Sequence, residues 1–242
     1  GPPHAEFERL RRDDPVHRQE MPDGTSYWAV LRHADVVEVS RNPQLFSASR
    51  GGVTLEDLDE GSLAMMQDML LAMDPPRHQR HREPLSPHFR ARVVAGLEPR
   101  VRAVCRAAVD SVGEGHIEAV HDVCARIPAE VIGELVGIPE EDRPRIHRWA
   151  ERCVGGQDPA VGEQAADDAM QASVEMAMYA IELAARRRAE PAEDLVTVLL
   201  GTEVDGAPMS DVAFGSFFVQ LVVAGNDTSR TLLSSMLGAL VQ

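Results

Sequence analysis

Two short segments carry the residue types that could do chemistry. The first contains His78 and Arg82, which stand four residues apart just after Pro75-Pro76. Proline is tolerated in the first turn of a helix, so the segment predicts a helix with both side chains on one face. An imidazole beside a guanidinium suits a carboxylate or a phosphate, because hydrogen bonds to charged groups contribute about 1.5–3 kcal/mol each. The alternative is a solvated basic face that pairs with Glu83 and neighbouring acids.

The second segment interrupts an apolar run with the sequence Gly225, Asn226, Asp227, Thr228, Ser229. A glycine in a helix interior costs about 1 kcal/mol relative to alanine, and the next four residues compete for backbone hydrogen bonds, so their presence needs a reason. Ala224 and Gly225 remove side-chain bulk, which would let a flat ligand approach the backbone. Thr228 can donate its hydroxyl to the carbonyl of Ala224 and open the helix there.

Asp227 and Thr228 would then offer a carboxylate and a hydroxyl that relay protons into a dry pocket. The alternative is a helix kink with an Asp227–Arg230 ion pair.

Helices must position both segments, since apolar residues recur at helical spacing over most of the chain. Before residue 78 we expect short helices at 7–12 and 34–40, and a strand at 26–31 that forms a hairpin after the Pro22-Asp23-Gly24 turn. Residues 49–68 carry several glycines and acids with weak periodicity, which predicts an irregular loop.

Further along, three apolar stretches predict helices: Leu97, Val101, Val104, Ala108 and Val112; residues 131–136; and Met170, Val174, Met178 and Ile181. We expect the Met-rich stripe to be core, because methionine fills gaps in cores. A helix at 195–200 ends at Gly201. Ser210 caps a last helix, which Asn226, Asp227 and Arg230 mark as a buried helix of a globular fold and not a membrane span.

The composition excludes several classes of protein. The chain has 242 residues, 44% hydrophobic, with a net charge of −15, which is globular and a poor match for nucleic acid. Three cysteines, far apart, argue against a disulfide framework and for a reducing cytoplasm. Neither a signal peptide nor a membrane anchor is visible at the start. Every basic residue is Arg, with no Lys and much Ala, which indicates a GC-rich bacterial gene.

Taken together, the two segments resemble cytochrome P450. Asp74-Pro75-Pro76-x-His78-x-x-x-Arg82 and Ala224-Gly225-Asn226-Asp227-Thr228 occur in that family's order, about 145 residues apart, and the resemblance runs through the whole chain. It implies a mainly α fold with a small N-terminal β-sheet, the P450 fold incomplete at its C-terminus. Residues 1–242 would form a single domain.

The resemblance also implies residue roles. His78 and Arg82 would hold a propionate of haem b (iron protoporphyrin IX), and Ala224 and Gly225 would let the central helix pass over the distal haem face. Thr228 and Asp227 would steer water and protons to dioxygen at the iron, ahead of the oxidation of a C–H bond. The loop at 49–68 would lie over the substrate.

The implied activity is that of a cytoplasmic haem-thiolate monooxygenase. Its partners would be an apolar small molecule (a terpenoid, steroid, lipid or polyketide), O2, and electron donors of the ferredoxin and ferredoxin reductase type, with no nucleic acid and no membrane.

Two features of the family are missing from this sequence. The haem-ligating cysteine in its Phe/Gly-rich stretch and the Glu-x-x-Arg pair are absent, and Cys105, Cys124 and Cys153 lack that context, so no residue is assigned as a metal ligand. We expect these residues to be the N-terminal part, somewhat more than half, of a full-length enzyme. The alternatives are a haem-free P450-like auxiliary protein that binds and activates another enzyme, and a plain helical interaction domain. A haem-free auxiliary protein would have no use for an acid-alcohol pair, Asp227 and Thr228, in an apolar helix.

Overall fold

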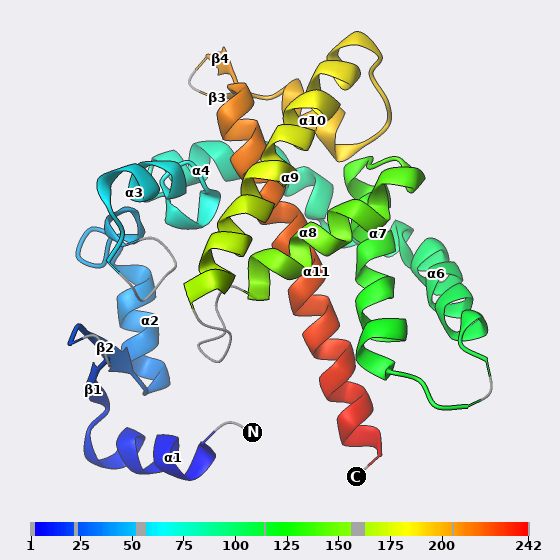
Figure 1. Cartoon of the computed structure of the whole chain (residues 1–242). Coiled ribbons are helices and arrows are strands. Elements are labelled where there is room, and N and C mark those ends of the chain that lie inside the picture. The colour runs from blue at the N-terminus through cyan, green and yellow to red at the C-terminus, as the bar shows by residue number, and fades with distance from the viewer. Residues whose placement is uncertain are drawn as a thin grey trace. The chain divides into compact units, whose positions relative to one another are not determined.

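The structure is a computed structural model that describes residues 3–21, 24–51, 57–113, 115–155, 163–204 and 206–241. It is mainly α-helical with a small N-terminal sheet, as expected (Figure 1). The α-helices are α1 His4–Asp13, α2 His33–Arg41, α3 Glu60–Met66, α4 Arg77–Arg82, α5 Ala91–Gly96, α6 Glu98–Ser111, α7 Arg126–Val136, α8 Arg143–Gly155, α9 Glu163–Ala189, α10 Leu195–Leu200 and α11 Asp211–Leu240.

Shorter elements join them. Two antiparallel strand pairs are described, β1 Val16–Glu20 with β2 Ser26–Val30, and β3 Glu203–Val204 with β4 Ala207–Pro208. Short 3-10 helices lie at Ala48–Arg50, Leu70–Ala72, Glu83–Phe89 and Glu140–Asp142, and a π-helical turn at Val120–Ala125 leads into α7. The chain divides into two compact units, Gly1–Gln79 and Arg80–Gln242, which we describe separately. A single domain over 1–242 stays a prediction.

The first unit contains the predicted helices and hairpin. β1 pairs with β2 from Val16 opposite Val30 to Glu20 opposite Ser26. The Arg32 side chain, just after the hairpin, donates from Nε to the carbonyl of Arg11 at 2.9 Å and so satisfies a carbonyl at the end of α1. Pro22 and Asp23 of the predicted turn lie outside the described residues.

The prediction of an irregular loop at 49–68 is wrong in its second half, where α3 lies. Asp59 caps this helix: its Oδ1 accepts from the N–H groups of Gly61 (2.9 Å) and Ser62 (3.0 Å), and its Oδ2 accepts from the Ser62 hydroxyl (2.6 Å). The capping bonds of Asp59 stabilise a helix whose apolar periodicity is weak, because they satisfy backbone donors that would otherwise have no partner. Residues 52–56 lie outside the described residues.

The second unit is built around α11, which packs against α7, α8 and α9 (Figure 1). Ser210 caps α11 as predicted, since its Oγ accepts from the Ala213 N–H at 3.2 Å. Phe214, Phe218 and Val222 are buried on one face of the helix at intervals of four residues. α11 is therefore the buried central helix that the sequence predicts.

The prediction that the Met-rich stripe of α9 is core is wrong. Met170, Val174 and Met178 are 49%, 46% and 56% exposed. The opposite face is buried instead, through Ala172, Met176, Tyr179, Ala180 and Leu183. The small residues on that face allow a close approach to α11, where a Cβ built on Gly215 would meet Ala177 Cβ at 3.4 Å. The face of α9 that turned inward is thus the one rich in small residues, and not the Met-rich stripe.

Candidate functional site

The face of α11 that carries Ala224 and Thr228 is open. Both residues are exposed, whereas Val222 and Asn226 on the other face are buried. Thr228 Oγ1 donates to the Ala224 carbonyl at 2.7 Å, as predicted. The helix does not open there, because α11 runs unbroken from Asp211 to Leu240. A carbonyl has two lone pairs, so it can accept the hydroxyl and still keep its helical hydrogen bond.

Gly225 faces a neighbouring helix. A Cβ at this position would lie 2.9 Å from Cδ1 and 3.2 Å from Cγ1 of Ile132 on α7. The missing side chain thus allows α7 and α11 to approach closely. Contact between Gly225 and haem stays a prediction.

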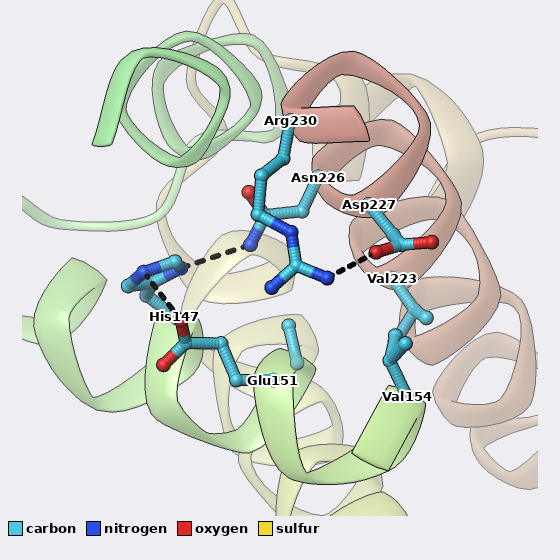
Figure 2. Close-up of a pocket in the computed structure, with 8 residues that line it drawn as sticks. His147, Glu151, Val154, Val223, Asn226, Asp227 and Arg230 are labelled. Atoms are coloured by element: carbon cyan, nitrogen blue, oxygen red, sulfur yellow. Dashed lines mark hydrogen bonds and ion pairs between the residues drawn. The ribbon is translucent and has the colours of Figure 1, made fainter. Parts of the chain in front are cut away.

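Asp227 points toward α8, and Arg230 holds it there. The Arg230 Nη2 atom donates to Asp227 Oδ1 at 2.5 Å, the pairing that the sequence offers as its alternative for this segment. The two residues line a shallow hollow together with Glu151 and Val154 of α8. Figure 2 shows the Arg230 guanidinium between Asp227 and the residues of α8. Asp227 and Thr228 therefore lie on adjacent faces of the same turn of α11.

Asn226 is the residue of this segment whose contacts the sequence did not predict. It is 5% exposed, and its Nδ2 lies 3.0 Å from Nδ1 of His147 on α8 (Figure 2). Its Oδ1 is buried without a hydrogen-bond partner. His147 Nε2 in turn lies 3.5 Å from Glu151 Oε1. Asn226 and His147 are 79 positions apart, and no sequence signal links them.

Burial lowers the pKa of His147, and nearby charges modify this effect. Glu151 acts in the opposite direction, while His121, Arg230 and Arg148 reinforce the lowering. Because burial disfavours the charged form, the ring is held toward its neutral state.

The predicted helix that carries His78 and Arg82 is α4, Arg77–Arg82. Asp74 anchors its start within the first unit: the Asp74 carbonyl accepts the His78 N–H at 3.0 Å. The Asp74 carboxylate accepts from the Ser47 hydroxyl, from Ala48 N–H (2.8 Å) and from the Ser49 hydroxyl (2.9 Å). The Ser47 bond is the main cause that holds the pKa of Asp74 below its ordinary value. The carbonyl that starts α4 is thus fixed, and the propionate role of His78 and Arg82 stays a prediction.

The three cysteines lie in different elements: Cys105 on α6, Cys124 in the π-helical turn and Cys153 on α8. Cys105, Cys124 and Cys153 are all free, and Cys124 is buried. Burial raises the pKa of the Cys153 thiol, although Ser173 lies 3.2 Å from the sulfur and acts in the opposite direction. Within the described ranges, no three His, Cys, Asp or Glu side chains gather as metal ligands.

Known proteins resemble this chain over nearly its whole length. It is 35% identical over 250 residues to a steroid C26-monooxygenase of Mycolicibacterium smegmatis, covering 99% of this chain and 58% of that protein. A cytochrome P450 of Mycobacterium marinum, solved in complex with pseudoionone, superposes with a TM-score of 0.84 at 34% identity, over 95% of this chain and 58% of that one. The chain belongs to the cytochrome P450 family.

A further relative agrees with this assignment. The P450 chain is 34% identical over 238 residues to a methyl-branched lipid omega-hydroxylase of Mycobacterium bovis, covering 94% of this chain and 55% of that protein. A search against family models found no match. The chain spans less than three fifths of the length of these relatives. Family membership implies haem as the cofactor and confirms the predicted fold class.

The open face of α11 fits such a group. Ala224 presents a methyl group, and one turn later the Thr228 hydroxyl is drawn back onto the Ala224 carbonyl, so no bulky side chain rises between them. A flat macrocycle can lie against small side chains of this kind.

None of the helices in the described ranges is long and apolar enough to cross a membrane.

Proposed function

We propose that the whole protein is a haem-thiolate monooxygenase that oxidises an apolar small molecule. This chain would supply α11, the helix whose open face would lie beside the haem on the side where O2 binds. The observation that carries the proposal is the Ala224–Thr228 step, with a hydroxyl fixed at 2.7 Å from a helix carbonyl on an open face. Haem supplies the redox chemistry by which one atom of O2 enters a C–H bond.

Residues of α11 would supply protons to that reaction through water. The Thr228 hydroxyl donates a hydrogen bond to the Ala224 carbonyl, so the Thr228 oxygen keeps lone pairs with which to accept a hydrogen bond from water on the open face. Arg230 binds Asp227 at Oδ1, and we assign Oδ2 to the exchange of protons with water. His78 and Arg82 would hold the haem carboxylates from α4.

Relatives suggest the substrate class. Their names concern a steroid C26 position and methyl-branched lipids, and pseudoionone is a branched terpenoid ketone. We therefore propose an apolar, branched aliphatic substrate, with pseudoionone as the first compound to test.

Charge suggests the electron donor. In a chain with net charge −15, residues 80–106 hold seven arginines against two glutamates, and all seven arginines are exposed. An acidic ferredoxin, reduced by its reductase, would be attracted to this region. Free thiols suit a reducing compartment, so we propose the cytoplasm as the location.

The absorption spectrum of the full gene product, reduced under carbon monoxide, tests the haem-thiolate assignment. We expect the Soret band near 450 nm for which the family is named. A protein that folds but shows no haem absorption would contradict the proposal and favour the haem-free auxiliary protein.

Thr228→Ala tests the oxygen-side step. We expect haem to stay bound while product per electron pair falls roughly tenfold or more and peroxide rises, because the hydroxyl that orders water is lost. Product and peroxide assays measure this effect. Thr228→Ser, which keeps the hydroxyl, should restore most of the coupling, and unchanged coupling in Thr228→Ala would refute the role.

Arg82→Ala tests the propionate assignment. The loss of one charge-assisted hydrogen bond of about 1.5–3 kcal/mol should weaken haem retention roughly 10- to 100-fold. Haem transfer to apomyoglobin measures the retention. Arg92→Ala, which also removes an exposed arginine of this region, is the control, and equal retention in both variants would overturn the assignment.

A further inference from the structure

Asn226 is a polar residue placed where α11 is otherwise apolar. It borders a second, shallow hollow lined mainly by aliphatic side chains, among them Ile132, Ile146 and Val222. A buried amide in such surroundings costs free energy unless it is hydrogen-bonded. Only its Nδ2 has a partner, His147, and Oδ1 has none. A buried amide oxygen without a partner needs an explanation other than packing.

The direction of the Asn226–His147 bond fixes the tautomer of the ring. The Asn226 Nδ2 can only donate, so it bonds a His147 Nδ1 that carries no proton. The neutral ring then carries its proton on Nε2, on the side of the Glu151 carboxylate at 3.5 Å.

Protonation of His147 would make this arrangement untenable. Both ring nitrogens then donate, and two donors would face each other across 3.0 Å. A half-turn of the Asn226 amide brings Oδ1, now without a partner, opposite Nδ1–H, and the new bond is charge-assisted and stronger. The amide nitrogen takes the unpartnered place, so each protonation state has its own amide orientation.

Charged groups on three elements face the ring and decide between the two states. Glu151 of α8 favours the charged ring, whereas Arg148 of α8, Arg230 of α11 and His121 of the π-helical turn disfavour it, as does burial. Arg143 lines the second hollow beside the ring, and Asp227 lines the first beside Arg230.

We propose that Asn226 and His147 form a latch between α11 and α8 that positions the Asp227–Thr228 step, and that protonation of His147 reverses and strengthens the latch bond. Asn226 lies in the same turn of α11 as Asp227 and Thr228, so a bond that ties Asn226 to α8 also holds the turn from which the carboxylate and the hydroxyl project. The proposal rests on the proposed monooxygenase function.

The first experiment reads the latch without turnover. In the full-length haem protein with 15N-labelled histidine, NMR should show one ring with an unprotonated Nδ1 and a protonated Nε2 that titrates below ordinary histidines, and this signal should be missing in His147→Gln. In Asn226→Leu the charged ring loses the Oδ1 acceptor, so the ring should titrate at a still lower pH. A ring that is protonated on Nδ1 when neutral, or a titration unchanged in Asn226→Leu, would overturn the latch.

The second experiment reads positioning, with pseudoionone as probe and a surrogate ferredoxin and reductase as electron source. The peroxide yield per electron pair should rise roughly fivefold as pH rises through the titration of His147, the factor that about 1 kcal/mol corresponds to. His147→Gln, which can still bond Asn226 but does not titrate, should remove the pH dependence. His116→Gln, at an exposed histidine that is not among the groups acting on His147, is the control and should keep it.

The outcomes separate the two proposals. Absence of haem and of the 450 nm band in the wild-type protein contradicts the proposed function, while the NMR result still decides on the latch. A normal 450 nm band with the same peroxide pH profile in wild type and His147→Gln refutes the latch alone.

Discussion

Two polar contacts between helices of the second unit differ in how completely their groups are paired. The first, which we call the clamp, joins Arg187 of α9 to Asp194, which precedes α10, and to Gly137 at the end of α7. Arg187 Nε donates to Asp194 Oδ2 at 2.5 Å, and its Nη2 donates to the Gly137 carbonyl at 2.9 Å. The other carboxylate oxygen accepts the Thr197 N–H at 2.8 Å and caps α10. The second contact is the Asn226–His147 latch, which leaves Oδ1 unpaired.

The difference indicates what each contact is for. The Asp194 side chain is 6% exposed, and both of its oxygens have partners, so any other arrangement loses a hydrogen bond at a buried charge. The clamp therefore has one stable state. The latch lies between two hollows, and the second amide orientation that we propose for it would also make one bond to the ring, so the latch could respond to a proton. The fully hydrogen-bonded Asp194 carboxylate stabilises one arrangement of its helices, whereas the Asn226 amide, with one group unpaired, can change its hydrogen bond.

The largest expected effect is at the clamp. Gly137 has φ +92°, and a Cβ there would overlap the Asp194 carboxylate, so Gly137→Ala combines backbone strain with displacement of a buried charge. We expect a loss of at least about 3 kcal/mol in the free energy of unfolding, measured by denaturant titration of the full-length protein. Gly206→Ala is the matched control, because its φ is +78° with no atom within 4 Å, and it should cost only about 1 kcal/mol. Equal losses would show that strain alone matters and that the clamp contributes nothing.

A smaller effect is expected beside the latch, at Gly225. Gly225→Ala should cost about 1–2 kcal/mol through overpacking against Ile132, partly offset by better helix propensity. In an Ile132→Val background the Cδ1 atom is gone, so the same change should cost about 1 kcal/mol less, as a double-mutant cycle of unfolding free energies would measure. Additive effects would mean that the glycine does not serve the α7–α11 contact.

The sequence predicted the local elements well, because their signals are local. Ser210 with Asp211 predicts the start of α11, and the Thr228 bond to Ala224 follows from helix geometry alone. The Met-rich stripe failed because α9 carries apolar residues on more than one face. Which face turned inward depended on the contact between Ala177 and Gly215, on different helices.

The candidate site divides in the same way. The four-residue spacing of His78 and Arg82 on α4 follows from the chain itself. Asp74 stood in the motif, but its three partners near Ser47 lie some 25 positions earlier and could not be predicted. His147 was missed for the same reason, since its importance depends on Asn226, a partner on another helix.

The smallest expected effect is the pH dependence that the latch adds to stability. Burial lowers the pKa of folded His147, so the folded state binds fewer protons than the unfolded state as pH falls below about 6.5. Protonation strengthens the proposed bond to Asn226, but burial costs the charged ring more. The contribution of neutral His147 to stability is therefore fully present above that pH and is lost as pH falls toward the lowered pKa. Thermal unfolding of wild type and His147→Gln between pH 8 and 5 should show this as a difference that shrinks with acid and stays below either glycine effect. The Gly137→Ala loss at the clamp offers the contrast, because it comes from overlap with the Asp194 carboxylate and does not involve His147. A Gly137→Ala loss that is the same at pH 8 and pH 5 would confirm that the pH effect belongs to the latch.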